Sequence, residues 1–112
     1  MNERAATALH AMRASAQLAL RYAREHPTWP TDQLVIDAIA KRIEDVADAA
    51  KMRFPRALRD EFPEIPWDEI AGMRDRLAHD YASVDLDILR EVVAEHLPHL
   101  VRSIDRVLPS TR

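Results

Sequence analysis

The sequence predicts an all-α fold, and three observations favour helices over strands. Glycine occurs once in 112 residues, whereas the tight turns of a sheet-rich fold require several. Apolar residues recur at three- and four-residue steps, which places them on one face of a helix. Prolines separate the segments that carry this pattern. A chain of this length has room for one core, so we expect residues 1–112 to form one domain, an up-and-down bundle of four to five helices.

Two long helices are expected in the first half of the chain. The first runs from about Glu3 to Glu25 and is ended by Pro27 and Pro30. Thr31 or Asp32 can cap the second helix. Its apolar stripe suits a bundle seam and comprises Ile36, Ile39, Ile43, Val46 and Ala50.

The middle of the chain predicts a short helix from Pro55 to Phe62, an extended link to Trp67 and a third long helix from Trp67 to about His79. Gly72 lies inside this third helix. Glycine costs a helix interior about 1 kcal/mol relative to alanine, so it usually marks a close approach by another backbone. We expect such an approach here, and a subunit contact is one form it could take.

The last helix is expected to begin after Asp85 as its cap and to run to about Leu108, with Pro98 kinking it. Its acidic residues and histidines, which are Glu91, Glu95, His96 and His99, raise the question of a metal site. Carboxylate-bridged bundles need Glu-x-x-His pairs on two helices plus two further glutamates. That pattern is missing, so no metal ligand and no cofactor is predicted.

The composition restricts the function in several ways. Cysteine is absent, which removes disulfides and thiolate chemistry. The N-terminal residues lack the unbroken apolar run of a signal peptide or membrane span, so a cytoplasmic protein without a membrane partner is expected. The formal charge of −3 argues against a protein that coats nucleic acid without specificity.

Charge is nevertheless unevenly distributed. A basic stretch contains Lys51, Arg53, Arg56 and Arg59, and an acidic stretch contains Asp60, Glu61, Glu64, Asp68 and Glu69. Two solvated faces are the plainer interpretation, and a local binding patch is the alternative.

The segment from Ile65 to Tyr81, IPWDEIAGMRDRLAHDY, is more specific than composition requires. It resembles the central signature of the HepT-like toxins of the HEPN superfamily, in which Ile-Pro-Trp leads into Gly-Met-Arg-Asn and then His-x-Tyr. Val84-Asp85 and the segment from Leu97 to Leu100 also fit. Ala47 and Asp48 stand where Gly-Glu is usual, and Asp75 stands where asparagine is commoner.

The resemblance implies a HEPN-type bundle that forms a homodimer, with the two motifs in a cleft at the interface. It implies a metal-independent endoribonuclease in which Arg74 and His79 are the catalytic pair, with Asp75 and Tyr81 as associated motif residues. It also implies a toxin–antitoxin pair whose antitoxin is a nucleotidyltransferase of the MNT type that transfers AMP to the motif tyrosine, here Tyr81.

The residue types suit cleavage of RNA by its own 2'-hydroxyl. Histidine titrates near neutrality and can move the proton, and arginine offers a planar charged fork to the phosphate. Arg76, Lys51, Arg53 and the rest of the basic stretch are candidates for RNA contact.

Two alternatives to this catalytic interpretation stay open. Arg74 could pair with Asp75, Asp80 or an acid on another helix, and His79 and Tyr81 could be structural. The chain could also be a catalytically inactive HEPN scaffold that serves as a binding subunit for the nucleotidyltransferase. Positions five apart lie about 140° apart around an ideal helix, so Arg74 and His79 meet only if the helix ends or distorts, or if a second subunit completes the site.

Overall fold

The computed structural model describes residues 1–77 and 84–109, and regular structure within them is entirely helical. The main helices are α1 (Glu3–Glu25), α2 (Gln33–Asp48), α3 (Trp67–Leu77), α4 (Leu86–Glu91) and α5 (Leu97–Val107). Shorter helical segments are η1 (Trp29–Thr31), η2 (Ala49–Arg53), η3 (Arg56–Glu61) and η4 (Val92–His96). In this part of the chain, no helix has the length and apolarity that crossing a bilayer requires.

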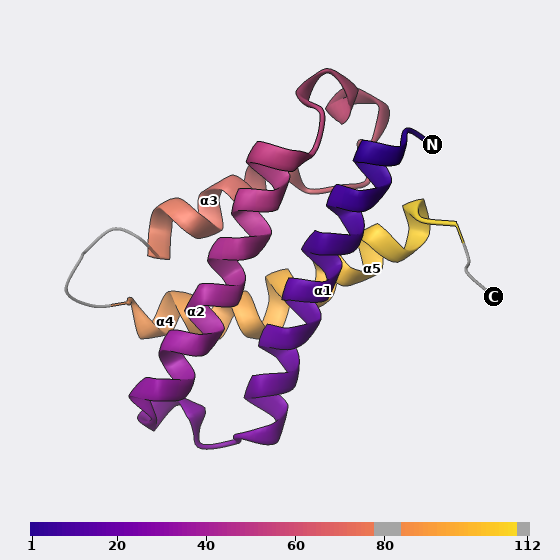
Figure 1. The fold of residues 1–112 in the computed structure, drawn as a ribbon. Helices are drawn as coiled ribbons and strands as arrows, with labels where there is room; N and C mark the ends of the chain where they lie inside the picture. The colour runs from indigo at the N-terminus through magenta and orange to yellow at the C-terminus, as the bar shows by residue number, and fades with distance from the viewer. Residues whose placement is uncertain (78–83, 110–112) are drawn as a thin grey trace.

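Helices α1 and α2 form an antiparallel hairpin, as Figure 1 shows. The buried face of α1 consists of Ala5, Ala8, Leu9, Met12, Ala16 and Ala19. Four of these six side chains are alanines, which let the larger isoleucines of α2 approach closely. Ile39 and Ile43 are fully buried, and burial of each such side chain contributes about 1.5–3 kcal/mol.

The hairpin link confirms the role of Asp32. Its carboxylate accepts a hydrogen bond from the backbone N–H of Leu34 at 3.1 Å, so Asp32 and not Thr31 caps α2. Trp29 lies buried in η1 between the two helices. Because this link is short, α2 turns back and runs antiparallel to α1.

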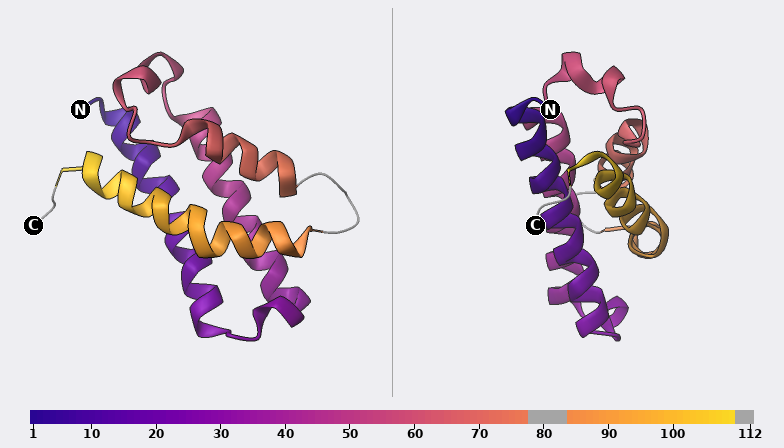
Figure 2. Two further views of the ribbon diagram at one scale, coloured as in Figure 1. Left: turned by 180° about the vertical axis from the view of Figure 1, so that it is seen from behind. Right: turned by 90° about the vertical axis from the view of Figure 1, so that its right-hand side faces the viewer.

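The remaining helices form a second layer. Figure 2 shows α3 and the run from α4 to α5 on one side of the hairpin, with α4 to α5 crossing it obliquely. The expected up-and-down order therefore describes α1 and α2, but not the last helix. A long connection, from Ala49 to Pro66, separates α2 from α3, so no tight link fixes the direction of α3 relative to α2.

The last helix begins at the expected cap. Asp85 accepts hydrogen bonds from the backbone N–H groups of Asp87 and Ile88. The expected disturbance near Pro98 takes the form of a widened π-helical turn, η4, directly before α5. Proline lacks the N–H and its ring crowds the carbonyl four residues earlier, so the ladder changes register in the preceding turn.

Gly72 is not explained by contacts within the described residues. Apart from its chain neighbours and the backbone of its own helix, a Cβ placed on Gly72 would meet no atom within 4 Å. The expectation of a close approach is therefore wrong for the part of the chain that the structure describes.

Candidate functional site

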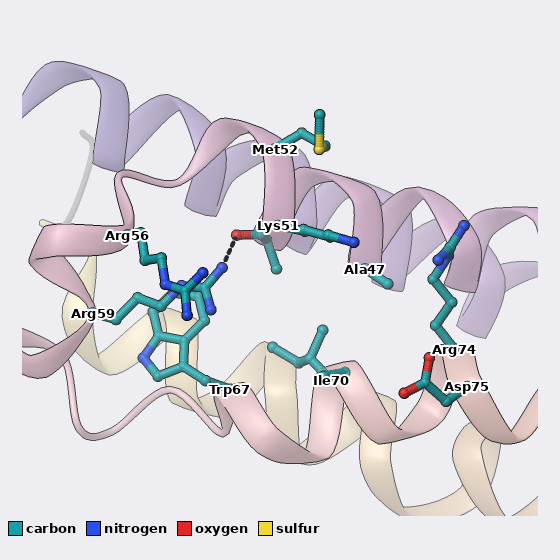
Figure 3. Close-up of a pocket in the computed structure, with 11 residues that line it drawn as sticks. Ala47, Lys51, Met52, Arg56, Arg59, Trp67, Ile70, Arg74 and Asp75 are labelled. Atoms are coloured by element: carbon teal, nitrogen blue, oxygen red, sulfur yellow. Dashed lines mark hydrogen bonds between the residues drawn. The ribbon is translucent and has the colours of Figure 1, made fainter.

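A basic groove lies between the C-terminal end of α2, the η2 and η3 segments and α3, with a volume of about 400 Å³. Figure 3 shows its side chains, with Arg56 and Arg59 at one end and Arg74 and Asp75 at the other. Its apolar floor includes Ala47, Ala50, Ile70 and Ala71, and its charged lining comprises Lys51, Arg56, Arg59, Arg74 and Asp75. The groove thus joins the basic stretch of the sequence to the arginine of the motif.

Arg74 projects from α3 toward α2. Its Nε lies 3.5 Å from Oδ1 of Asp48, and the two side chains are 44% and 46% exposed. An ion pair at this exposure contributes about 0–1 kcal/mol, because water and salt screen it. Arg74 is therefore held near the groove by a weak contact that an incoming anion can replace.

Arg59 is the most firmly placed of the groove's cations. One terminal nitrogen donates a hydrogen bond to the carbonyl oxygen of Ala50 at 2.9 Å. Its guanidinium lies 5.3 Å from the ring centroid of Trp67, within the range of a cation–π contact. The Trp67 ring also contacts Phe54, and its Nε1 donates to the carbonyl oxygen of Phe62.

The structure separates the residues that the sequence proposed for RNA contact. Lys51 lines the basic groove, but Arg53 lies on the other side of η2, among residues of α1 and α2. Arg76 faces away from the groove and donates to Oε2 of Glu91 at 2.9 Å. That hydrogen bond, followed by the charge of Arg76, holds the pKa of Glu91 below its ordinary value of 4.5.

Two of the predicted site residues, His79 and Tyr81, lie outside the described residues. Asp75 lines the groove beside Arg74, but the arginine is paired with Asp48 and not with Asp75. Of the alternatives that the sequence left open for Arg74, an acid on another helix is the one observed among the described residues, and Asp80 lies outside them.

Sequence reasoning missed the part that Asp48 and Trp67 play at this site. Asp48 was visible only as a departure from the family pattern, and Trp67 only as part of Ile-Pro-Trp. The sequence does not predict either contact, because Asp48 and Arg74 are 26 positions apart and Arg59 and Trp67 are 8 positions apart. Arg56 and Arg59 were visible as members of the basic stretch.

A second polar cluster lies between α3 and the last helix. Glu69 accepts a hydrogen bond from Nδ1 of His96, and its other oxygen lies 3.6 Å from Nδ1 of His99. Nε2 of His96 lies 3.6 Å from Glu91. Within the residues that the structure describes, no three such side chains are arranged to hold a metal ion. The cluster therefore ties α3 to the last helix.

The fold and the site define a small, all-helical protein with an exposed arginine at the rim of a cationic groove. The family model described as ribonuclease HepT-like matches residues 16–107. The chain therefore belongs to the HepT-like family of the HEPN superfamily, as its motif indicated.

Three relatives support the same family. A protein of Caldanaerobacter subterraneus, provisionally named an RNase, is 32% identical over 69% of this chain and 68% of its own length. A Methanocaldococcus jannaschii protein, named a gamma-glutamylcyclotransferase and provisionally an RNase, is 37% identical over 70% of this chain and 35% of its own. A Thermococcus cleftensis protein, provisionally named ribonuclease HepT, is 36% identical over 62% of this chain and 63% of its own. No solved structure matches the chain.

Proposed function

We propose that this protein is a metal-independent endoribonuclease and the toxin of a toxin–antitoxin pair. The observation that carries the proposal is the position of Arg74, which is exposed at the rim of a groove lined by three further cations. Arginine keeps its positive charge at neutral pH and so stabilises the negative charge that develops on a phosphate during transfer. Membership of a family described as ribonucleases supports RNA as the substrate.

In the proposed reaction, the 2'-hydroxyl of one nucleotide attacks the adjacent phosphorus and loses its proton, and the 5'-oxygen leaves and gains one. His79 carries one of these protons, a role that contributes about 10²–10⁴-fold. The guanidinium of Arg74 holds the non-bridging phosphate oxygens. The products are a 2',3'-cyclic phosphate and a 5'-hydroxyl, so no water is consumed in this step.

The directions in which Arg74 and Arg76 point indicate that His79 does not reach Arg74 on an ideal helix. Arg74 faces α2 and Arg76 faces α4, as their separation of about 200° around the helix requires. If α3 continued as an ideal helix, His79 would lie about 60° from Arg76 and about 140° from Arg74. We therefore propose that a homodimer completes the site, with the histidine of one subunit near the arginine of the other.

Cleavage of RNA in the presence of chelator tests the nuclease proposal. Purified protein is incubated with a labelled single-stranded RNA, and the products are resolved by length and by their terminal phosphate. We expect Arg74→Ala and His79→Ala to lose at least 100-fold in rate, and Arg102→Ala, an exposed arginine of α5, to keep the wild-type rate. Wild-type cleavage no faster than that of His79→Ala would refute the catalytic assignment.

The antitoxin in this proposal is a nucleotidyltransferase of the MNT type that modifies Tyr81. The phenol oxygen attacks the α-phosphorus of ATP, pyrophosphate leaves, and the phenol proton passes to solvent. The added AMP would place negative charge and bulk two residues from His79, where RNA must enter.

Intact mass after co-expression with the nucleotidyltransferase tests this modification. We expect a mass increase of one or more AMP groups on wild type and on Tyr22→Phe, and none on Tyr81→Phe. The control is well matched, because Tyr22 is the other tyrosine of the chain. An unmodified wild type, or modification that survives in Tyr81→Phe, would contradict the assignment.

The second candidate function is a catalytically inactive scaffold that acts as a binding subunit for the nucleotidyltransferase. The pairing of Arg74 with Asp48 and the presence of Asp75 in the groove favour it, because both acids oppose a phosphate. In that case the complex with the nucleotidyltransferase forms while neither wild type nor Asp48→Asn cleaves RNA.

A further inference from the structure

The basic groove concentrates positive charge on a chain whose formal charge is −3. Four cationic side chains line it, Lys51, Arg56, Arg59 and Arg74, against one acidic side chain, Asp75. Among the described residues, Lys51 and Arg56 take part in no ion pair, and Arg74 has only its exposed contact with Asp48. An anionic ligand could therefore bind without breaking any ion pair of the described residues except the exposed one between Arg74 and Asp48.

The geometry of the groove suits an extended anion. Trp67 and Arg74 lie at opposite ends of the α3 wall, and seven residues of helix span about 10 Å. Phosphates along one nucleic-acid strand are spaced by about 3.4 Å of rise when the bases are stacked. Because consecutive phosphates are farther apart through space than this rise along the axis, the groove is long enough for about two of them, and Arg74 stands at one end.

The side chains of the groove favour contacts with the phosphate backbone of a nucleic acid over contacts with its bases. Proteins that bind single strands by stacking offer aromatic rings to the bases. The aromatic ring of this groove, that of Trp67, is already covered by Arg59 and contacts Phe54, and its N–H is used by the carbonyl of Phe62. Its polar and π surfaces are therefore engaged within the protein.

We propose that the basic groove binds the phosphate backbone of the RNA strand next to the scissile phosphate, without reading its bases. This inference rests on the proposed function for the identity of the strand. In it, Arg59 is a fixed cation, held by Ala50 and Trp67, while Lys51 and Arg56 adjust to the phosphates. Affinity then depends on salt and on strand length rather than on sequence.

The test measures binding of a labelled 12-nucleotide single-stranded RNA to the full-length chain by fluorescence anisotropy at several salt concentrations. The His79→Ala background prevents cleavage during the measurement. The groove variant is Lys51→Glu with Arg56→Glu. The control variant is Arg24→Glu with Arg102→Glu, which changes the net charge equally at exposed positions of α1 and α5. Circular dichroism verifies the fold of both variants.

We expect the groove variant to lose at least 10-fold in affinity and the control to lose less than 3-fold. Log affinity falls with log salt concentration, and each phosphate contact contributes about −0.7 to this slope. Losing two contacts should therefore make the slope less negative by about 1.4. A DNA strand of the same sequence, and RNA strands of other sequences, should bind within about 3-fold of the first. A groove variant that binds like the control, a preference for one sequence, or a wild type that binds no RNA would overturn the proposal.

This outcome is separable from that of the proposed function. Loss of binding in the groove variant, with no cleavage by a protein that retains His79, leaves the groove as a nucleic-acid site on a protein without nuclease activity. Cleavage by wild type that the groove variant matches in both rate and binding leaves the nuclease and overturns the groove.

Discussion

At the residue scale, neighbours in the sequence have different surroundings and therefore different roles. Arg74 and Arg76 are two residues apart, yet one reaches toward α2 at the groove and the other is paired with Glu91. Lys51 and Arg53 are divided in the same way by the η2 turn. The sequence predicts Lys51, Arg53 and Arg76 alike as RNA contacts, because residue type and proximity along the chain do not determine the direction in which a side chain points.

A comparison of single charge reversals checks this division. Lys51→Glu should weaken RNA binding by about 5-fold or more, because it places a carboxylate in the basic groove. Arg53→Glu changes the net charge equally but lies outside the groove lining, so it should weaken binding less than 2-fold. Anisotropy titrations at one salt concentration measure both, and equal losses would show that net charge rather than the groove controls affinity.

The ion pair of Arg76 and Glu91 has a pH dependence of known sign. Because Arg76 lowers the pKa of the Glu91 carboxyl in the folded state, folding favours the deprotonated form. This stabilisation is complete above the ordinary pKa of 4.5 and is lost as the pH falls below it. We expect urea midpoints of wild type to fall more steeply between about pH 5 and 3 than those of Glu91→Gln. Identical slopes would show that the pair contributes nothing to stability.

At the element scale, capping residues were the most predictable features. The expected first helix, Glu3 to Glu25, coincides with α1, and Asp32 and Asp85 cap the helices assigned to them. Caps can be predicted from sequence because the capping side chain bonds to backbone N–H groups only two or three residues away. The π-helical turn η2 was not predicted, whereas η4 lies where the sequence predicts a disturbance before Pro98.

Replacement of Gly72 tests whether this glycine only destabilises α3 or lies at a subunit contact. Nothing in the described residues opposes a Cβ at this position, so Gly72→Ala should raise the free energy of unfolding by about 0.5–1 kcal/mol. Urea denaturation measures the change. If Gly72 instead lies at a subunit contact, alanine should weaken self-association, which sedimentation velocity over a dilution series detects. A less stable chain with unchanged association would contradict both interpretations.

At the scale of the whole molecule, the fold brings consecutive segments between Ala47 and Asp75 around one groove. The basic groove exists because the end of α2, the η3 segment and α3 meet around one small volume. The alanine-rich face of α1 holds α2 in place, and the cluster of Glu69 with His96 and His99 ties α3 to the last helix.

Mixing two inactive variants tests the proposed composite site. A heterodimer of Arg74→Ala and His79→Ala retains one site with both residues if arginine and histidine come from different subunits. We expect such a mixture, after denaturation and refolding together, to recover roughly a quarter of wild-type cleavage. That fraction follows because half of randomly paired dimers are mixed and each has one of two sites intact. No recovery from a mixture that contains heterodimers would place both residues in one subunit.

The sequence by itself determined the all-α class, the family, the helix caps and the identity of the motif residues. These depend on local periodicity, on short-range hydrogen bonds and on a signature contained in seventeen residues. Only the tertiary structure decided that Asp48 faces Arg74, that Arg59 covers Trp67, and that Lys51 and not Arg53 enters the groove. Those contacts depend on the rotation and crossing of packed helices, which arise from side chains of distant segments fitting together.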